Sequence, residues 1–302
     1  MKVCNFGSLN LDHVYNVSHF VAAGETLSSE KMEIFCGGKG LNQSVSFAQA
    51  GAQVFHCGKI GTDGTILSQL LESYGVDIRF VRQTSTPTGH AIIQVDPSGQ
   101  NCILLYGGAN REIDLEQIDQ TLEFFGPGDL LMLQNEISGL AHLIPAAHKR
   151  GMTIAFNPSP IDSSLLQLPL ELVDYFLVNE VEGEALSGES EPSLILEGLR
   201  QKYPNACILL TLGKKGAVCL YDGQFYQHGI YKSKVMDTTA AGDTFTGYFL
   251  TCLLQHGMSP AQALEYASKA SSLAVSVQGA ARSIPTMEEV RSCRLVLQEE
   301  TI

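Results

Sequence analysis

Short apolar runs alternate with helix-like segments along most of this chain, and that alternation limits its fold more than any other feature. The runs are rich in aliphatic and aromatic residues and cover residues 3–9, 54–60, 130–133, 153–156, 175–178 and 207–212. Alternation of this kind is typical of α/β layered folds. The run Leu130-Leu131-Met132-Leu133 is apolar throughout, which suits a parallel strand covered on both faces. We therefore predict an α/β protein with a Rossmann-like, mostly parallel sheet flanked by helices.

Two stretches, residues 12–36 and 88–107, depart from this rhythm and have the character of β-rich insertions. In the second stretch, residues 91–95 and 102–106 flank the turn sequence Asp96-Pro97-Ser98-Gly99, which predicts a hairpin. We expect the two insertions together to form a small β-sheet lid. No internal repeat or low-complexity segment divides the chain, so residues 1–302 are predicted to form a single domain.

Charge and hydropathy argue against two broad classes of protein. A formal net charge of −13 without any basic run is unfavourable for binding nucleic-acid phosphates. No segment offers the ~18 consecutive apolar residues of a membrane-spanning helix. The first residues also lack the basic start and long apolar stretch of a signal peptide. We expect a soluble, cytoplasmic protein that binds neither nucleic acid nor membrane.

The eight cysteines include no closely spaced pair of the kind that marks a metal site. Several lie among apolar neighbours, as Cys207 and Cys219 do, where a thiol behaves as a small buried hydrophobe. In the reducing cytosol we expect all of them to be free thiols.

The segment Gly37-Gly38-Lys39-Gly40-Leu41-Asn42 is the first group of chemically informative residues. Its glycines allow a ligand to approach the backbone closely, and Lys39 and Asn42 offer donors at the start of a predicted helix. The spacing is neither that of a P-loop nor that of the dinucleotide-binding G-x-G-x-x-G motif. We interpret the segment as a site for a polar ligand with hydroxyl groups, while a glycine cluster alone would also fit a tight turn.

The second group is Asp237-Thr238-Thr239-Ala240-Ala241-Gly242-Asp243-Thr244, between a strand-like run at 234–236 and a predicted helix at 245–255. Its small residues leave backbone amides free at a helix N-terminus, which is a receptor for phosphate or for developing phosphoryl charge. Asp243 lies in the first turn and can take a proton from an attacking hydroxyl. A role as helix cap would account for Asp243 but not for the Ala-Ala-Gly run before it.

Together, these two segments resemble the two signature motifs of the ribokinase family of sugar kinases. The resemblance extends over nearly the whole chain, and further matching segments lie at 10–12, at Glu136, and at 179–182, 211–216 and 279–283. It implies a ribokinase-like fold with a small lid. It also implies an ATP-dependent kinase that transfers the γ-phosphate to a sugar hydroxyl.

The resemblance assigns roles to individual residues. It implies that Asp243 is the catalytic base and that the amides at Ala240, Ala241 and Gly242 form an anion hole. The residues implied to bind the sugar are Asn10, Asp12, Gly38, Lys39, Asn42, Glu136 and Asp243. Carboxylates and amides suit vicinal hydroxyls, and such a site penalises analogues that leave its buried polar atoms unpaired.

ATP, Mg²⁺ and a monovalent cation, usually K⁺, are the cofactors that the resemblance implies. The matching nucleotide contacts are Asn179, Thr211, Gly213, Gly216, Gly242 and Ser268. Asn179 and Glu182 match an N-x-x-E motif that orders the Mg²⁺ shell, with Glu182 acting through water. The positions that match the K⁺ site, most of them through backbone carbonyls, are Asp237, Thr239, Ala274, Val277, Gly279 and Ser283.

Within the family, Asn10, Asp12 and Glu136 resemble the set that binds ribose, so D-ribose, converted to ribose 5-phosphate, is the leading acceptor. Lid side chains that could line the pocket and change the acceptor are His90, Ile93, Leu105 and Tyr106. A kinase for another sugar or for a nucleoside-like polyol therefore stays open. An alternative of a different class is a non-catalytic sugar-binding sensor that has kept the fold.

The lid also predicts an assembly. Residues 32–35, 91–95 and 102–106 carry more apolar side chains than an exposed flap can leave uncovered, and unpaired strand edges invite association. The resemblance points the same way, because members of the family commonly dimerise through the lid, although some close it within one chain. We therefore expect a homodimer formed by lid-to-lid contact.

Overall fold

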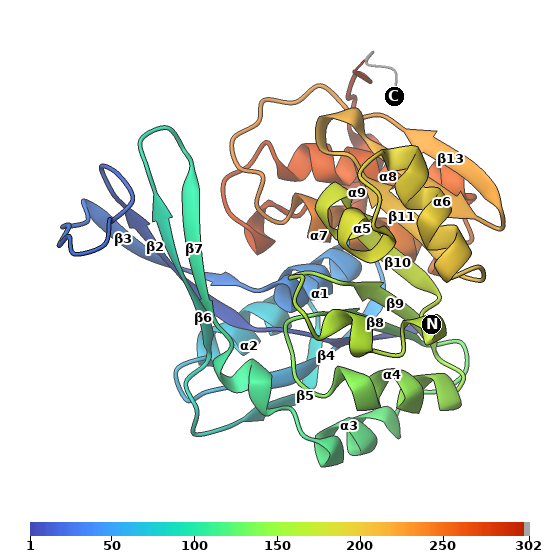
Figure 1. Cartoon of the computed structure of the whole chain (residues 1–302), viewed down its shortest axis with the longest axis horizontal. Coiled ribbons are helices and arrows are strands. Elements are labelled where there is room, and N and C mark those ends of the chain that lie inside the picture. Colours follow the sequence, from blue (N-terminus) through green and yellow to red (C-terminus); the bar gives the residue numbers. More distant parts are fainter. Residues whose placement is uncertain (299–302) are drawn as a thin grey trace.

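The computed structural model describes residues 1–298, which form a layered α/β domain with a second, smaller sheet at one side (Figure 1). The main sheet has nine strands in the order β13-β12-β11-β10-β9-β8-β1-β4-β5. Its strands are β1 (Lys2–Phe6), β4 (Gln53–Ile60), β5 (Asp77–Gln83), β8 (Leu130–Gln134), β9 (Thr153–Asn157), β10 (Tyr175–Asn179), β11 (Cys207–Thr211), β12 (Ala217–Tyr221) and β13 (Gln224–His228). All pairings from β5 to β11 are parallel, and β12 and β13 add an antiparallel edge. The predicted Rossmann-like sheet is therefore confirmed.

Helices cover both faces of this sheet, and each face has its own apolar core. One face packs against α1 (Lys39–Gln49), α2 (Thr65–Ser73), α7 (Ala241–Leu250), α8 (Pro260–Ala274) and α9 (Met287–Ser292). The other packs against α3 (Leu115–Leu122), α4 (Leu140–Lys149), α5 (Glu180–Ser187) and α6 (Pro192–Lys202). Adjacent residues of β1 divide between the two cores, since Val3 faces the first and Cys4 the second. Burial on both faces explains why these strands are apolar at every position.

The small sheet has the strand order β3-β2-β6-β7 and forms the predicted lid. Its strands are β2 (Asn10–Asn16), β3 (Lys31–Gly37), β6 (Gly89–Val95) and β7 (Asn101–Tyr106). The predicted hairpin is present, because β6 and β7 pair antiparallel and the carboxylate of Asp96 accepts a hydrogen bond from the amide of Ser98 in the turn. The first lid strand starts at Asn10, two residues before the predicted insertion.

Several predicted boundaries are wrong. The first strand ends at Phe6, not at residue 9, because residues 7–9 leave the main sheet and lead into the first lid strand at Asn10. Residues 234–236 are not a strand, since the amide of Met236 donates to the carbonyl of Val275 and not to a neighbouring strand. The helix predicted at 245–255 starts at Ala241 and ends in a π-helical turn, Thr251–Gln255.

Other local features follow from residue type. Ser259 caps α8 through a capping box with Gln262, and Pro260 is the first residue of that helix. All eight cysteines are free thiols, and the close pair Cys4 and Cys57 has its sulfur atoms 3.5 Å apart without a disulfide. Within residues 1–298, no helix is both long enough and apolar enough to cross a membrane.

The sheet order places a site at one edge. Strand β1 lies between β4 and β8, so the connections run in opposite directions on its two sides. In parallel sheets, such a switch point opens a crevice at the carboxyl ends of the strands, where ligands bind. The lid projects from this same edge, because β2 follows β1 directly (Figure 1).

Candidate active site

The loop before α7 is built to expose backbone amides. Ala240 has a left-handed backbone, with φ of 61°, a conformation that a residue with a side chain adopts at a cost of about 1 kcal/mol or more. The bend aims the first turn of α7 at open space, and an added Cβ at Gly242 would meet no atom within 4 Å. The first-turn amides of a helix have no acceptor within the helix. Here the amide of Ala241 donates to the carbonyl of Thr238 at 3.2 Å, so the amides of Gly242 and Asp243 are the ones available to an anion.

Asp243 lies in this first turn, 8% exposed, and is held by two amides from α1. Asn42 Nδ2 donates to its Oδ2 at 3.1 Å, and Gln43 Nε2 donates to its Oδ1 at 2.9 Å. The two helices can approach closely because Gly247 faces Ser46, where a Cβ on the glycine would lie 2.2 Å from the serine hydroxyl. Packing of α1 on α7 therefore fixes the Asp243 carboxylate.

A cavity of about 590 Å³ lies between the lid and the main sheet. Its lining includes every residue that the resemblance assigns to the sugar, namely Asn10, Asp12, Gly38, Lys39, Asn42, Glu136 and Asp243. The lid contributes one face only, so Ile93 and Leu105 line the cavity. His90 and Tyr106 are not among the lining residues. The sequence-based set is thus brought together, apart from those two lid side chains.

The carboxyl groups of this cavity are held close together and largely buried. Burial, reinforced by the nearby Glu136 carboxylate, raises the pKa of Asp12 from 3.8 to about 7. Burial also raises the pKa of Glu136, and the hydroxyl of Ser8 and the charge of Lys39 oppose that shift. The backbone leaves room for this pair, since a Cβ at Gly37 would lie 1.9 Å from an Asp12 oxygen.

Lys39 supplies the positive charge between these carboxylates. Burial alone would lower the pKa of its ammonium group, but the charges of Asp243, Glu136 and Glu182 outweigh burial and raise the pKa above its usual value. Lys39 therefore stays protonated at neutral pH. It lines both the large cavity and a second one on the other side of Asp243.

The second cavity has a volume of about 270 Å³ and meets the first at Lys39, Ala240 and Asp243, which line both. Its other lining residues include four from the predicted nucleotide and Mg²⁺ set, Asn179, Glu182, Thr211 and Gly242. Strand ends β10 and β11 and the N-termini of α5 and α7 surround it. A phosphate chain in this cavity would face the amides of α7, with Asp243 between it and a ligand in the larger cavity.

Asn179 and Glu182 form a capping box at the start of α5. Glu182 is 5% exposed, and its Oε2 accepts from the backbone amide of Asn179 at 3.0 Å and from Asn157 Nδ2 at 3.2 Å. The side chains thus have a structural role as helix cap and also line the smaller cavity. Their oxygen-rich character suits Mg²⁺ held through water.

The predicted K⁺ positions come from two segments that lie side by side. Asp237 joins them, because its Oδ2 accepts from the amide of Gly279 at 3.0 Å while its Oδ1 accepts from Thr239. Ser283 lies in the following 3₁₀ turn and donates to the carbonyl of Ala280. Ala274 ends α8, and its carbonyl accepts from the amide of Val277. The loop from 237 to 239 is thereby tied to the turn after α8.

Three predicted nucleotide contacts lie outside the lining of both cavities. Gly213 and Gly216 follow β11 and have positive φ angles of 55° and 93°, which shape the turn into β12. Ser268 is 2% exposed inside α8, and its Oγ has no hydrogen-bond partner among the described residues. The roles of these three residues stay predictions.

Sequence reasoning missed four polar residues of the site, one of which is Ser8, whose hydroxyl donates to Glu136. Gln43 bonds Asp243, Asn157 bonds Glu182, and Asn110 donates to Asn10 Oδ1 at 2.8 Å. Gln43 is next to Asn42 in the glycine-rich segment, which was the one available signal. Asn110 and Asn157 reach the site only through the folded chain.

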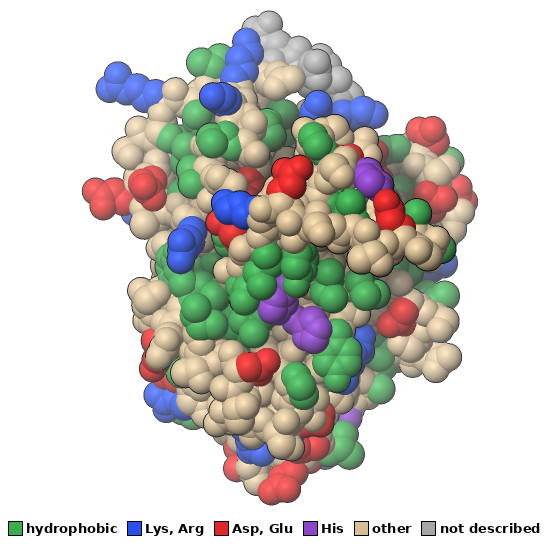
Figure 2. All heavy atoms as spheres, turned by 90° about the vertical axis from the view of Figure 1, so that its left-hand side faces the viewer, with side chains coloured by type: hydrophobic (Ala, Val, Ile, Leu, Met, Phe, Trp, Pro, Cys, Tyr) green, Lys and Arg blue, Asp and Glu red, His purple; other side chains and the backbone are tan. Residues whose placement is uncertain are grey.

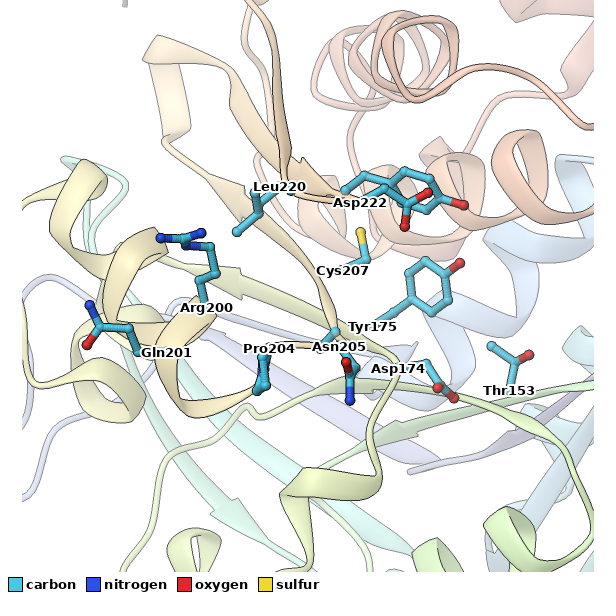
Figure 3. A pocket seen from close by; sticks show the side chains of 13 residues that line it. Thr153, Asp174, Tyr175, Arg200, Gln201, Pro204, Asn205, Cys207, Leu220 and Asp222 are labelled. Atoms are coloured by element: carbon cyan, nitrogen blue, oxygen red, sulfur yellow. The ribbon is translucent and has the colours of Figure 1, made fainter.

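A third cavity, of about 610 Å³, lies at the opposite end of the main sheet (Figure 3). It is lined by the first residues of three strands, Thr153, Tyr175 and Cys207, whereas the site lies beyond the last residues. None of its lining residues belongs to the motifs described above. Large volume alone therefore does not identify the site.

Comparison with known proteins agrees with this geometry. The family model described as "pfkB family carbohydrate kinase" matches residues 1–287. The chain belongs to this family. Among curated relatives, the ribokinase of Staphylococcus aureus is 35% identical, with 96% of this chain and 98% of the relative covered.

Solved structures of ribokinases superpose closely on this chain. The ribokinase of Cryptococcus neoformans in complex with ADP has a TM-score of 0.84 and 33% identity, and the match covers 96% of this chain and 98% of the other. The ribokinase of Arabidopsis thaliana complexed with ribose and ATP also has a TM-score of 0.84, with 29% identity and coverage of 96% and 97%. The predicted family and fold are confirmed.

Proposed function

We propose that this chain is an ATP-dependent ribose kinase, which transfers the γ-phosphoryl group of ATP to the 5-hydroxyl of D-ribose. The observation that carries the proposal is the position of Asp243, which lines both cavities at the N-terminus of α7. The acceptor would occupy the cavity of about 590 Å³ beside the lid, and the triphosphate the cavity of about 270 Å³. Relatives that are ribokinases, one of them complexed with ribose and ATP, support ribose as the acceptor.

Asp243 would act as general base. Its carboxylate takes the proton of the attacking hydroxyl while the new O–P bond forms. The bond between the γ-phosphorus and the bridging oxygen breaks at the same time, and ADP leaves with that oxygen. The amides of Gly242 and Asp243, with Lys39 beside them, would stabilise the charge that develops on the phosphoryl oxygens.

The lid side of the cavity would hold the sugar. Asn10 and Asp12 lie at the base of β2, and Glu136 lies across from them near the end of β8. Since Asp12 has a pKa of about 7, its carboxyl group can both donate to and accept from a sugar hydroxyl near neutral pH. The apolar residues Ile93 and Leu105 would cover the ligand and help to exclude water.

Mg²⁺ and K⁺ belong to the same proposal. Glu182 and Asn179 would hold the water shell of Mg²⁺, which when bound neutralises phosphate charge. Asp237, Thr239, Ala274, Val277, Gly279 and Ser283 would surround K⁺, as the tie between Asp237 and Gly279 supports. This chain's own contribution is to keep the loop before α7 in one arrangement.

We also propose that two copies assemble through their lids. One face of the lid lines the cavity, and the opposite face carries the row Ile34, His13, Ile92 and Leu104, which are paired in register across the four strands. Ile34, Ile92 and Leu104 are 53%, 38% and 67% exposed. Figure 2 shows hydrophobic side chains around two histidines on the side of the molecule where the lid lies.

A cytoplasmic location is also part of the proposal, because free thiols such as Cys207 and Cys219 persist in the cytosol.

A sugar panel tests the function. Purified protein is incubated with ATP, Mg²⁺ and K⁺ and with ribose, 2-deoxyribose, fructose or a nucleoside, and ADP release is measured. We expect the highest kcat/KM with ribose, and Asp243→Asn should lower kcat about 10²- to 10⁴-fold while the variant still binds ATP.

Other outcomes have definite meanings. A higher kcat/KM with another sugar would mean that the chain is a sugar kinase whose preferred acceptor is not ribose. Ribose binding without ADP release would indicate a sensor. Normal turnover by Asp243→Asn would remove Asp243 from the role of base.

A further inference from the structure

The Asp243 carboxylate ends a continuous chain of buried polar side chains that no motif includes. This series of hydrogen bonds, the relay, runs from His56 on β4 through Ser44, Asn5, Gln134 and Gln43 to Asp243. Gln43 is 1% exposed, and Asn5, Gln134 and His56 are fully buried. Buried polar groups of this kind are costly unless every bond is made with its donor on the correct side.

The direction of each donor follows from one backbone carbonyl. His56 Nε2 lies 3.2 Å from the carbonyl of Gly7, which can only accept, so Nε2 carries the proton. Burial lowers the pKa of His56 to about 4, so the ring is neutral and Nδ1 is bare. Ser44 therefore donates to Nδ1 at 2.8 Å and accepts from Asn5 Nδ2 at 2.8 Å.

The same logic continues to the site. Asn5 uses both hydrogens of its Nδ2, one on Ser44 and one on the carbonyl of Gly40, so its Oδ1 must accept from Gln134 Nε2 at 3.0 Å. Gln134 gives its other hydrogen to Gln43 Oε1 at 2.6 Å. Gln43 is left with its Nε2 facing Asp243.

We propose that Gln43 is a positioning residue for the base, and that the chain from His56 locks its amide in the donating orientation toward Asp243 Oδ1. Asn42 holds Oδ2 from the other side, so the carboxylate plane is fixed by two amides from adjacent positions of α1. A reversed Gln43 amide would place its oxygen against the carboxylate, and the relay prevents this. The inference rests on the proposed function of Asp243.

The backbone is shaped to admit this relay. A Cβ at Gly7 would lie 2.4 Å from Gln134 Oε1 and 2.6 Å from the Cα of Gly40. That Gln134 oxygen is buried and has no hydrogen-bond partner among the described residues. The fold of the described residues thus leaves Gln134 Oε1 unpaired, while both hydrogens of Gln134 Nε2 are used within the relay. This is expected if the direction of each donor matters.

Gln43→Met tests the proposal, since methionine keeps the volume and removes the amide. Loss of a hydrogen bond to a charged group should lower kcat by about 10- to 100-fold, with KM for ribose and ATP changed by less than about threefold. The matched control is Gln117→Met. Gln117 is also fully buried, and its Nε2 donates to the carbonyl of Gly58, away from both cavities.

A kcat for Gln43→Met equal to that of Gln117→Met would overturn the proposal, as would a change confined to KM. If Gln43→Met does not fold, Gln134→Met interrupts the relay one residue earlier and should lower kcat about 2- to 10-fold. Unchanged kcat in that variant would likewise contradict the relay.

A structural readout separates this inference from the proposed function. Crystal structures of the unliganded wild type and of Gln43→Met, or of Gln134→Met in its place, are compared at Asp243. A carboxylate that turns in the variant supports the positioning role even if the wild type phosphorylates no sugar in the panel. An unmoved carboxylate overturns that role even if the wild type is an active kinase.

Discussion

Asp12 shows how the fold changes the chemistry of one residue. Its carboxyl lies at the start of the lid, close to Glu136, and its pKa is raised from 3.8 to about 7. Because the folded state holds this proton more tightly than the unfolded chain, the residue's contribution to stability is complete below pH 4. It is lost as the pH rises to about 7. Ionisation of Asp12 near neutral pH therefore lowers the stability of the unliganded protein at its own binding site.

Replacing Asp12 with Asn should reveal this loss of stability. We expect Asp12→Asn to become more stable relative to wild type as the pH rises from 4 to about 7, with a constant difference above about pH 8. Urea unfolding across this range measures it, and ribose binding should weaken. Asp77→Asn is the control in which stability should change in the opposite direction. Arg79 lowers the pKa of Asp77, so replacing this carboxylate should destabilise the protein above pH 4. A flat difference for Asp12→Asn would contradict the raised pKa.

At this scale, sequence motifs predict which residues meet but not how they are held. Asn42 and Asp243 were recognisable because glycines and small residues surround them. Gln43 was not, since a chain of amides through Asn5 and Gln134 connects residues far apart in the sequence. The pattern of apolar and polar residues carries no signal for such a network.

Among the elements, the loop before α7 depends on a neighbour. Asp237 bonds Gly279, so the turn after α8 braces the strained bend at Ala240. Sequence reasoning predicted a strand at residues 234–236 because a short run with apolar residues is ambiguous. The hairpin of β6 and β7 was predicted correctly, since the turn residues from Asp96 to Gly99 fix its geometry locally.

A bound cation should act through this brace. At fixed ionic strength we expect K⁺ to raise kcat about 5- to 100-fold over Na⁺, because a filled loop orients the amides of α7. Asp237→Ala should abolish the difference between the two salts, and Glu116→Ala, on the far face of the sheet, should leave it intact. ADP release in KCl and NaCl is the measurement. Equal rates in both salts for the wild type would exclude a K⁺-selective site.

For the molecule as a whole, the lid has two faces with different tasks. Ile93 and Leu105 face the cavity, while Ile34, Ile92 and Leu104 face outward from the same small sheet. The period of two along each strand alone produces this division. The sequence predicted that the lid is apolar, but only the strand register tells which side chains remain uncovered.

Assembly through that outer face can be tested with one charge. Wild type should have about twice the monomer mass of 32.6 kDa in sedimentation velocity, and Leu104→Asp should shift it to monomer because it buries an unpaired charge in the contact. Leu166→Asp is the matched control, since both leucines are 67% exposed and Leu166 lies outside the lid. A monomeric wild type with full ribose kinase activity would rule out the lid-to-lid dimer.

The central place of β1 affects how the chain folds during synthesis. β1 is the first strand made, and β4 can pair with one of its edges once residue 60 has been released. Its other edge waits for β8, which ends at Gln134, so an apolar strand edge stays open while more than a third of the chain is translated. Open edges of this kind attract other chains. The nascent chain therefore carries an edge of its central strand that is open to association until residue 134 leaves the ribosome, long before the site at Asp243 exists.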